Sequence, residues 1–259
     1  MCPYICVSRD KKAEFDELPV NTGEKLDVSV VIPTYNEEGN IRRLIDALSG
    51  ALKGYKFEIV VVDDASKDST PGIIDSCAGK GIVFAVHRTG IKGIFSAILD
   101  GIKVAGGKNV LVMDADFSHP PGKAAELMRY AGNYDVVSGS RFIRGGGINA
   151  PLTRTFGTVL FNYAIRFILG FRISDWTGGF HVINRKRFMQ IPFKYGADWG
   201  EFDLELLYRA VKMGFRIKEV PFHYSFREEG ASKSAEGAGF LVGYAWKYGI
   251  RALRLRLFG

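Results

Sequence analysis

The sequence predicts an α/β protein with a mostly parallel central sheet flanked by helices. From Val28 onward, short apolar runs alternate with amphipathic stretches, which is the pattern of strands joined by right-handed helical crossovers. Several of the apolar runs end abruptly in polar or acidic residues, as strands do at the ligand-binding edge of such sheets. The chain has 259 residues, of which 47% are hydrophobic, and this is enough for one sizeable core.

The elements follow one another in a regular order. Strands are expected over residues 28–32, 59–62, 82–86, 110–113 and 136–137. Helices are expected around residues 38–52, 70–78, 93–105 and 121–131. Because parallel strands all point the same way, their carboxyl ends should meet at one edge of the sheet.

The segment VLVMDADFSHPP, residues 110–121, carries the strongest chemical signal. Its apolar run ends at Asp114 and Asp116, which are two residues apart and can therefore face one site. Paired carboxylates favour a cation, and oxygen ligands suit Mg²⁺ or Mn²⁺, which complete their coordination with water and substrate phosphates. The residues alone leave open an alternative, in which both acids are solvated turn residues before a helix that starts at Pro120 and Pro121.

Two other expected strands end in polar turns. The first runs into PTYNEE, residues 33–38, where Pro33 ends the strand and Asn36 can cap the next helix. The second runs into DDASKDST, residues 63–70, whose side chains can accept hydrogen bonds from a base or ribose. Either turn alone could be purely structural, but three polar strand ends on one edge favour a nucleotide site.

An ordered set of motifs extends this interpretation over most of residues 28–233. The motifs are VSVVIPTYNEEGNI, EIVVVDDASKDST, VLVMDADFSHPP, VVSGSRF, SDWTGGF, FDLELLYRA and EVPFHYSFREEGASK. In this order they resemble the family 2 glycosyltransferases of the GT-A fold, and within them the dolichyl-phosphate mannose synthase group. The resemblance implies transfer of a hexose, with inversion, from a nucleotide sugar, most favourably GDP-mannose, to a dolichyl or other polyprenyl phosphate, with Mg²⁺ or Mn²⁺ as cofactor.

The resemblance also implies roles for individual residues. It predicts contacts with the donor nucleotide at Pro33, Tyr35, Glu37, Val62 and Asp64. It predicts binding of the metal and diphosphate at Asp114, Ala115 and Asp116, with Ser118 as a further candidate metal ligand. Binding of the donor and acceptor phosphates is predicted at Arg141, Arg154, Arg227 and Lys233. Among these residues, the catalytic roles are assigned to Asp116, Arg141 and Arg227.

The chemistry of such a transfer agrees with these residue types. A metal and cationic side chains can stabilise the charge that develops on the leaving diphosphate, and arginine binds phosphate through two parallel hydrogen bonds. A phosphomonoester acceptor has a second pKa of about 6, so it is largely dianionic near neutrality and needs no strong base. His119, beside the acids, is therefore expected to support the metal ligands or to have a structural role.

Three departures from the family pattern bear on donor and acceptor preference and leave the reaction class unchanged. The family usually reads Asp-Ala-Asp-Leu-Gln-His-Pro-Pro, whereas this chain has Phe117 and Ser118, which replace a side-chain amide by a hydroxyl. The loop at residues 144–151 lacks the Trp that usually precedes its Pro, and Asp203 stands where Gln is common. Glu205 is expected on a helix, with an ion-pair or capping role ahead of a catalytic one.

Other functions remain as alternatives. The donor could be UDP-glucose with the same lipid acceptor, or the protein could bind nucleotide sugars or lipid phosphates without catalysis, an option that Ser118 motivates. The net charge of +7 favours polyanionic partners, but no nucleic-acid recognition motif accompanies it, so nucleic acid is not an expected partner.

The domain organisation is expected to be simple. Residues 1–27 form an N-terminal extension without the apolar core of a signal peptide, residues 28–235 the catalytic domain, and residues 236–259 a basic amphipathic helix. The three cysteines match no disulfide or zinc pattern and favour a reducing compartment. We expect a cytoplasmic protein that lies peripherally on the cytoplasmic face of a membrane.

Membrane contact is expected to be peripheral. The longest uncharged run near the carboxyl end covers residues 237–246, far short of the roughly 20 apolar residues that span a bilayer. In the expected helix at residues 236–259, basic residues including Arg251 alternate with aromatic and aliphatic ones such as Trp246 and Leu255, as in a helix that lies in the membrane interface. A second apolar helix is expected over residues 156–169, and for both helices packing against the domain is the alternative.

Overall fold

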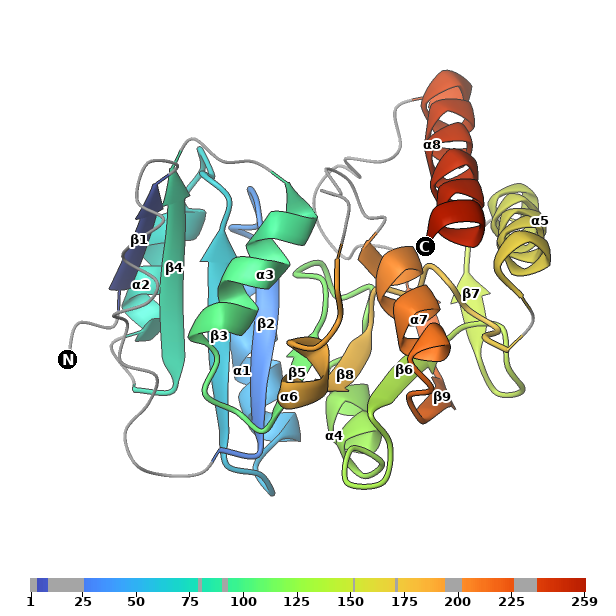
Figure 1. Ribbon diagram of the computed structural model, residues 1–259. Coiled ribbons are helices and arrows are strands. Elements are labelled where there is room, and N and C mark those ends of the chain that lie inside the picture. Colours follow the sequence, from blue (N-terminus) through green and yellow to red (C-terminus); the bar gives the residue numbers. More distant parts are fainter. Residues whose placement is uncertain are drawn as a thin grey trace.

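The computed structural model describes residues 4–8, 26–78, 81–89, 93–150, 152–170, 172–193, 202–225 and 237–259. Within these residues, the centre is an eight-stranded sheet in the order β1-β4-β3-β2-β5-β8-β6-β9, with helices on both faces (Figure 1). Its strands are β1 (Tyr4–Ser8), β2 (Val28–Thr34), β3 (Phe57–Asp63), β4 (Val83–Thr89), β5 (Asn109–Val112), β6 (Val136–Ser140), β8 (His181–Asn184) and β9 (Ile217–Pro221). The predicted α/β class with a mostly parallel sheet is confirmed.

The sheet departs from parallel pairing at one strand. The strands β1, β4, β3, β2 and β5 form parallel pairs, as do β6 and β9, whereas β8 lies antiparallel between β5 and β6. His181, the first residue of β8, pairs with Val112, the last residue of β5. The loop before β8 therefore reaches the carboxyl edge of β5. The strand β8 is not predicted from the sequence, because its four residues are too few to show a period.

Helices cover both faces of the sheet. They are α1 (Ile41–Ala51), α2 (Thr70–Ala78), α3 (Ile94–Val104), α4 (Gly122–Met128), α5 (Leu152–Leu169), α6 (Arg185–Phe188), α7 (Phe202–Lys212) and α8 (Gly237–Phe258). Alternate residues of β2 serve the two faces: Val30 and Ile32 join the core formed with α1, α2 and α4, and Val31 joins the core formed with α3 and α7. A strand buried on both faces reads as a continuous apolar run, which is why β2 and β3 could be predicted.

The strand β1 lies inside the stretch that the sequence analysis treats as an extension. It adds to the outer edge of the sheet by pairing in parallel with β4, so that Tyr4 lies opposite Ala85 (Figure 1). Part of residues 1–27 therefore belongs to the sheet, while the expected domain boundaries stay predictions.

The helices α5 and α8 lie side by side at the end of the molecule away from β1 (Figure 1). Tyr248, Ala252 and Leu255 form a buried face of α8. Arg251 is also buried, and its Nη2 donates to Glu205 Oε2 of α7 at 2.8 Å. The expectation that Arg251 and Leu255 lie in a membrane interface is therefore wrong: both point into the protein.

The remaining strands, β7 (Gly147–Asn149) and β10 (His223–Ser225), form a separate parallel pair beside the main sheet. Ser225 N lies 3.4 Å from Ser118 O, so β10 is attached to the segment that follows β5. In the part of the chain that the structure describes, no helix combines the length and apolar character that crossing a bilayer requires.

Candidate active site

Three strand ends meet at one edge of the sheet, as the sequence predicts. In the sheet register, Thr34 of β2 lies opposite Asp63 of β3, and Met113 N, just after β5, donates to Val31 O of β2. Within the described residues, the non-glycine residues with positive φ are Asn36, Ala65 and Phe117, and each follows one of these strands, with φ of 51°, 61° and 62°. Such conformations are costly for residues with a Cβ and cluster at functional sites, so this edge is the first candidate.

The turns after β2 and β3 hold one another through hydrogen bonds. Asn36 N donates to Ser66 Oγ at 2.8 Å, and Lys67 N donates to Asn36 Oδ1 at 2.8 Å. Glu37 N donates to Thr70 Oγ1 at 2.8 Å, at the first residue of α2. Residues 33–38 and 63–70, here called the nucleotide turns, are thus one connected unit.

The predicted nucleotide contacts lie in or beside these turns. Pro33 and Tyr35 are half-buried, and Glu37 is buried next to Asn40, whose Nδ2 donates to Glu37 Oε2 at 2.9 Å. Val62 is fully buried in the core, so only its main chain could border a ligand. The structure therefore brings these residues together, and their contact with a nucleotide stays a prediction.

Asp64 is held by a buried arginine that the sequence analysis did not single out. Asp64 Oδ1 accepts from Arg88 Nη1 at 2.7 Å, and Asp64 Oδ2 accepts from Gly93 N at 2.8 Å. Arg88 is buried, donates to Ser96 Oγ at 2.6 Å and pairs with Asp100 at 3.1 Å. Arg88 thus fixes Asp64 relative to α3. The signal in the sequence was a basic residue inside the apolar strand VFAVHRT.

Asp114 and Asp116 directly follow β5, with Asp114 half-buried and Asp116 buried. The segment is held by local hydrogen bonds: Asp116 Oδ1 accepts from Ser118 N at 3.1 Å, and Asp114 N donates to His119 Nδ1 at 3.0 Å. Ala115, between the acids, is buried in the apolar core. The two carboxylates are therefore presented by a segment whose main chain is fixed.

His119 is the link between the acids and the rest of the site. Because Nδ1 accepts from Asp114 N and Nε2 lies 2.8 Å from Gly178 O, its hydrogen bonds assign the proton to Nε2. The ring stacks on Phe180 with centroids 4.9 Å apart. Burial lowers the pKa of His119 to about 4, although the charge of Asp116 opposes this shift. His119 is thus neutral near pH 7 and has the structural role that the sequence predicts.

The side chains near Asp114 and Asp116 fit a metal with an open coordination shell. Both ring nitrogens of His119 are used by the main chain, which leaves oxygen donors. Among the described residues, no three His, Cys, Asp or Glu side chains gather as they would in a closed metal site. Two carboxylates suit Mg²⁺ or Mn²⁺, which take their other ligands from water and phosphate. The Ser118 hydroxyl is buried and makes no hydrogen bond of normal geometry to the described residues.

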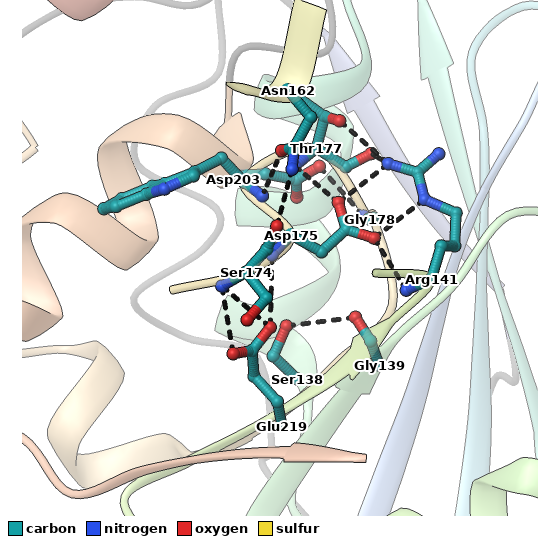
Figure 2. Close-up of polar contacts among 12 residues, drawn as sticks. Ser138, Gly139, Arg141, Asn162, Ser174, Asp175, Thr177, Gly178, Asp203 and Glu219 are labelled. Atoms are coloured by element: carbon teal, nitrogen blue, oxygen red, sulfur yellow. Dashed lines mark hydrogen bonds and ion pairs between the residues drawn. The ribbon is translucent and has the colours of Figure 1, made fainter. Parts of the chain in front are cut away.

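The loop at residues 174–180 borders the candidate site and is held by buried side chains (Figure 2). Glu219 of β9 accepts from Ser174 N and Asp175 N at 3.0 and 3.1 Å. Asn162 of α5 accepts from Trp176 N at 3.2 Å, and Asp203 of α7 accepts from Gly179 N at 2.9 Å. Side chains from three separate elements therefore set the path of this loop, and Gly178 O of the loop contacts His119.

Arg141, which follows β6, is bound to this loop by a buried ion pair. Its Nε and Nη2 donate to Asp175 Oδ2 and Oδ1 at 2.7 and 2.8 Å, and Nη2 also donates to Thr177 O at 2.9 Å (Figure 2). Burial opposes both charges, but the attraction is stronger: the pKa of Asp175 is lowered and that of Arg141 is raised. The charge of Arg141 is thus balanced by Asp175, and its contact with the donor and acceptor phosphates stays a prediction.

The acids of α7 have structural partners. Asp203 Oδ1 lies 3.0 Å from His181 Nε2, in addition to its bond with Gly179 N. Glu205 is fully buried and pairs with Arg209 at 2.6 Å and with Arg251 of α8 at 2.8 Å. The expected ion-pair role of Glu205 is therefore the one that the structure has.

The chain matches the family described as "Glycosyl transferase family 2" over residues 29–191. The chain belongs to this family. The resemblance drawn from the motifs is thus confirmed, and the acid pair, the nucleotide turns and loop 174–180 all lie within the matched residues.

Curated relatives of this glycosyltransferase include a dolichol-phosphate mannosyltransferase from Pyrococcus furiosus, 35% identical over 80% of the chain. The matched part spans 58% of the length of that relative. A polyprenol monophosphomannose synthase from Mycolicibacterium smegmatis is 35% identical over 79% of each chain. An undecaprenyl-phosphate mannosyltransferase from Micrococcus luteus is 32% identical over 89% of the chain and 98% of its own length.

Solved structures confirm the GT-A type of fold. Glucosyl-3-phosphoglycerate synthase from Mycobacterium tuberculosis, in complex with Mn²⁺, UDP and glucosyl-3-phosphoglycerate, superposes with a TM-score of 0.65 at 20% identity, covering 89% of this chain and 80% of that one. The same enzyme has been solved with Mg²⁺ and UDP. At this identity, the likeness supports the fold of the glycosyltransferase and not its substrates.

Three predicted phosphate ligands lie beyond what the structure describes. Arg227 and Lys233 lie outside the described residues, and Arg154 lies in α5 with its side chain outside them. Conversely, the structure brings three residues to the site that the sequence analysis did not name as site residues: Arg88, Asp175 and Tyr224. Asp175 occurs in the quoted motif SDWTGGF, but its partner could not be predicted, because Arg141 is 34 residues away.

Proposed function

We propose that this glycosyltransferase moves mannose from GDP-mannose to a polyprenyl phosphate, with inversion at the anomeric carbon. The observation that carries the proposal is the pairing of two carboxylates with a neutral histidine whose ring nitrogens are both bound to the main chain. Such a site can hold a diphosphate through a metal but offers no base in His119, which suits an acceptor that is already an anion. The names of the three curated relatives support mannose and a polyprenyl phosphate.

Each part of the site has a role in this reaction. The nucleotide turns would bind the base and ribose, and Asp114 and Asp116 would hold Mg²⁺ or Mn²⁺ against the diphosphate. The metal would supply positive charge to the leaving diphosphate. Arg141 sits rigidly on Asp175 and would place its guanidinium beside the phosphates without rearrangement. Arg154, Arg227 and Lys233 would bind the acceptor phosphate.

A transfer panel tests the proposal. Radiolabelled GDP-mannose, UDP-glucose and GDP-glucose would each be incubated with a polyprenyl phosphate and Mg²⁺ or Mn²⁺, and lipid-linked label would be measured. We expect GDP-mannose to be the preferred donor and the product to be a β-mannosyl phosphate. Preference for UDP-glucose would move the assignment to a glucosyltransferase, and nucleotide binding without transfer would indicate a non-catalytic binding protein.

Peripheral membrane contact belongs to the same proposal, since the acceptor is a lipid. The helix α5 exposes a stripe of apolar side chains at positions 156, 160, 163 and 167, a spacing that puts them on one face. Phe156 and Phe167 are 70% and 81% exposed, values that are costly in water unless a partner covers them. The exposed residues Trp246, Leu257 and Phe258 of the neighbouring α8 extend the apolar surface.

Charge favours an anionic bilayer as the partner of this surface. Lys247, Arg254 and Arg256 are exposed on α8, and the Arg166 guanidinium lies 5.1 Å from the Tyr163 ring on α5. Basic and aromatic side chains together are typical of helices in the membrane interface. We infer that α5 and α8 rest together on the cytoplasmic face of a membrane, with α5 contributing the continuous apolar stripe.

Liposome flotation tests this contact. The double variant Phe156→Asp/Phe167→Asp should float less than the wild-type chain with anionic liposomes, and high salt should weaken the attachment of both. Met189→Asp is the matched control, because Met189 is an exposed apolar residue after α6, on another part of the molecule. Equal flotation of the double variant and the control would exclude α5 from the contact.

A further inference from the structure

The helix α5 has two faces with different surroundings. One face carries the exposed apolar stripe, whereas Asn162, Ile165 and Leu169 are buried on the opposite face. Their spacing of three and four residues places these three side chains on one side of the helix. Asn162 is polar and only 1% exposed, so its amide needs hydrogen-bond partners inside the protein.

The Asn162 amide binds loop 174–180 on both sides of Asp175. Asn162 Nδ2 donates to Ser174 O at 2.5 Å, and Asn162 Oδ1 accepts from Trp176 N at 3.2 Å. In Figure 2, Asn162 lies at the top of this part of the loop and Glu219 at the bottom. Because the loop is irregular and mostly buried, its main-chain groups need side-chain partners. One side chain of α5 thus fixes the main chain before and after Asp175.

Asp175 in turn holds Arg141, the predicted phosphate ligand. The Asp175 carboxylate accepts from Arg141 Nε, Nη2 and N at 2.7, 2.8 and 3.0 Å. Arg141 Nη2 also donates to Thr177 O and Thr177 Oγ1, at 2.9 and 2.8 Å. The position of the Arg141 guanidinium is therefore set by the loop, and a shift of the main chain at Asp175 would move this guanidinium as well.

A second set of contacts leads from the same loop to the acids. Gly178 O lies 2.8 Å from His119 Nε2, and His119 Nδ1 accepts from Asp114 N at 3.0 Å. Loop 174–180 thus contacts both Arg141 and the segment that carries Asp114. Asn162 holds this loop at its first residues, so it can influence both without touching a substrate.

We propose that Asn162 is a positioning residue of this glycosyltransferase: it holds loop 174–180 so that Asp175 keeps Arg141 in place for the phosphates. The inference rests on the proposed function, because it takes Arg141 to be a phosphate ligand. It also gives the buried face of α5 a task in the reaction. The helix whose exposed face would rest on the bilayer thus holds, from its other face, the loop that orients Arg141.

The test compares Asn162→Ala with the wild-type chain in transfer from GDP-mannose, or from UDP-glucose if that is the preferred donor, to a polyprenyl phosphate. We expect kcat to fall about 10- to 100-fold, because a binding group displaced by about 1 Å can cost about 100-fold in rate. The affinity for the matching monophosphate, GMP or UMP, should be unchanged in isothermal titration calorimetry, since the nucleotide turns are held by hydrogen bonds to each other. General loosening of the fold would weaken both.

Ile165→Ala is the matched control. Ile165 is 1% exposed on the same face of α5, about one turn from Asn162, and its apolar side chain cannot form a hydrogen bond to the loop. This variant should lower Tm at least as much as Asn162→Ala, because it leaves a cavity in the core. Its kcat, measured well below Tm, should stay close to that of the wild-type chain.

The outcomes separate the two proposals. If Asn162→Ala kept the wild-type kcat, or lost no more of it than Ile165→Ala, Asn162 would have only a structural role, and the inference would be wrong while the proposed function stood. If Asn162→Ala did not fold, Asn162→Ser, which retains a short polar side chain, would be judged by the same criteria. If the wild-type chain transferred no sugar, both proposals would fall.

Discussion

The nucleotide turns and loop 174–180 border the same edge of the sheet but are built differently. The two turns are joined to each other mainly by hydrogen bonds of exposed or half-buried side chains, such as Asn36 with Ser66 and Lys67, while the buried Arg88 and Thr70 hold Asp64 and Glu37 from below. Loop 174–180 is held by buried charges, with Asp175 fully buried on Arg141 and Glu219 accepting from the loop main chain. The contacts between the nucleotide turns thus lie mostly at the surface, whereas loop 174–180 is part of the protein interior.

The difference has an energetic consequence. A hydrogen bond at the surface can be replaced by water, so its loss costs about 1 kcal/mol. A charge that loses its partner in the interior has no such replacement. We therefore expect stability to depend on the buried charges of loop 174–180 much more than on the exposed hydrogen bonds of the nucleotide turns, whereas both regions should matter for activity.

The largest effect should come from breaking the buried ion pair. Asp175→Asn leaves the Arg141 charge without compensation, and we expect a loss of about 3–5 kcal/mol in the free energy of unfolding. Glu38→Gln is the matched control in the nucleotide turns, where exposed Glu38 accepts from Ser69 N at 2.9 Å, and it should cost about 1 kcal/mol. Chemical denaturation measures both values, and equal losses would refute the contrast between the two regions.

Loss of one acid should affect activity far more than stability. Asp116→Asn should lower the transfer rate by about 100- to 1,000-fold, since it removes a charge that would hold the metal at the diphosphate. Chelation of divalent metal should have a similar effect. Asp46→Asn, at an exposed position on α1, should transfer at the wild-type rate. Near-normal turnover of Asp116→Asn, or of the chelated enzyme, would exclude the two-carboxylate metal role.

The pH dependence of stability should reveal the buried histidine. Burial lowers the pKa of His119 to about 4 from its usual 6.5, so the unfolded chain takes up a proton at a higher pH than the folded one. The contribution of His119 is therefore fully present above pH 6.5 and is lost as the pH falls toward 4, by about 3 kcal/mol in total. Urea denaturation of the wild-type chain and of His119→Gln at several values in this pH range measures how the free energy of unfolding of each protein changes with pH. If the difference in free energy of unfolding between the two proteins stayed the same over the range, His119 would not be buried as a neutral group.

The smallest effect, with the opposite sign, is expected at His87 on β4. Asp63 raises the pKa of His87, against the effect of burial, and Asp75 at 2.8 Å adds to the increase. The stabilisation by His87 should therefore be complete below pH 6.5 and be lost as the pH rises through the higher pKa of the folded protein. It should be smaller than that of His119, because water screens the half-exposed pair. His87→Asn should remove the dependence, and a slope of the same sign as that of His119 would contradict the assignment.

The part of the site formed by the nucleotide turns and the acids after β5 could largely be predicted from the sequence. The buried strands β2, β3 and β5 appear as continuous apolar runs, and their polar ends can be found by position alone. The parallel arrangement then requires that Pro33, Asp64 and Asp114 lie on one edge, and they do. The structural role of His119 could also be inferred, although its two partners could not.

The part of the site formed by loop 174–180 could not be predicted from the sequence and required the tertiary structure. The strand β8 is too short to show a period, and its antiparallel insertion is what brings loop 174–180 to the carboxyl edge of β5. Arg251 was expected at a membrane surface, because its neighbours on the helix are basic and apolar, but it is buried on Glu205, 46 residues earlier. A local sequence pattern cannot distinguish a helix face that packs against the protein from one that lies in a membrane interface, because both faces contain basic and apolar residues.

The sequence by itself determined the fold class, the strand ends that carry the acids and the family of the chain. These features depend on periodicity, turn chemistry and motifs, which act over a few residues at a time. The tertiary structure decided which charges are buried with which partners, which face of α8 points inward and that the Tyr224 ring lies 5.6 Å from the Arg141 guanidinium. Those choices follow from the packing of segments far apart in the chain, where the cost of burying a charge is offset only if its partner arrives in the right place.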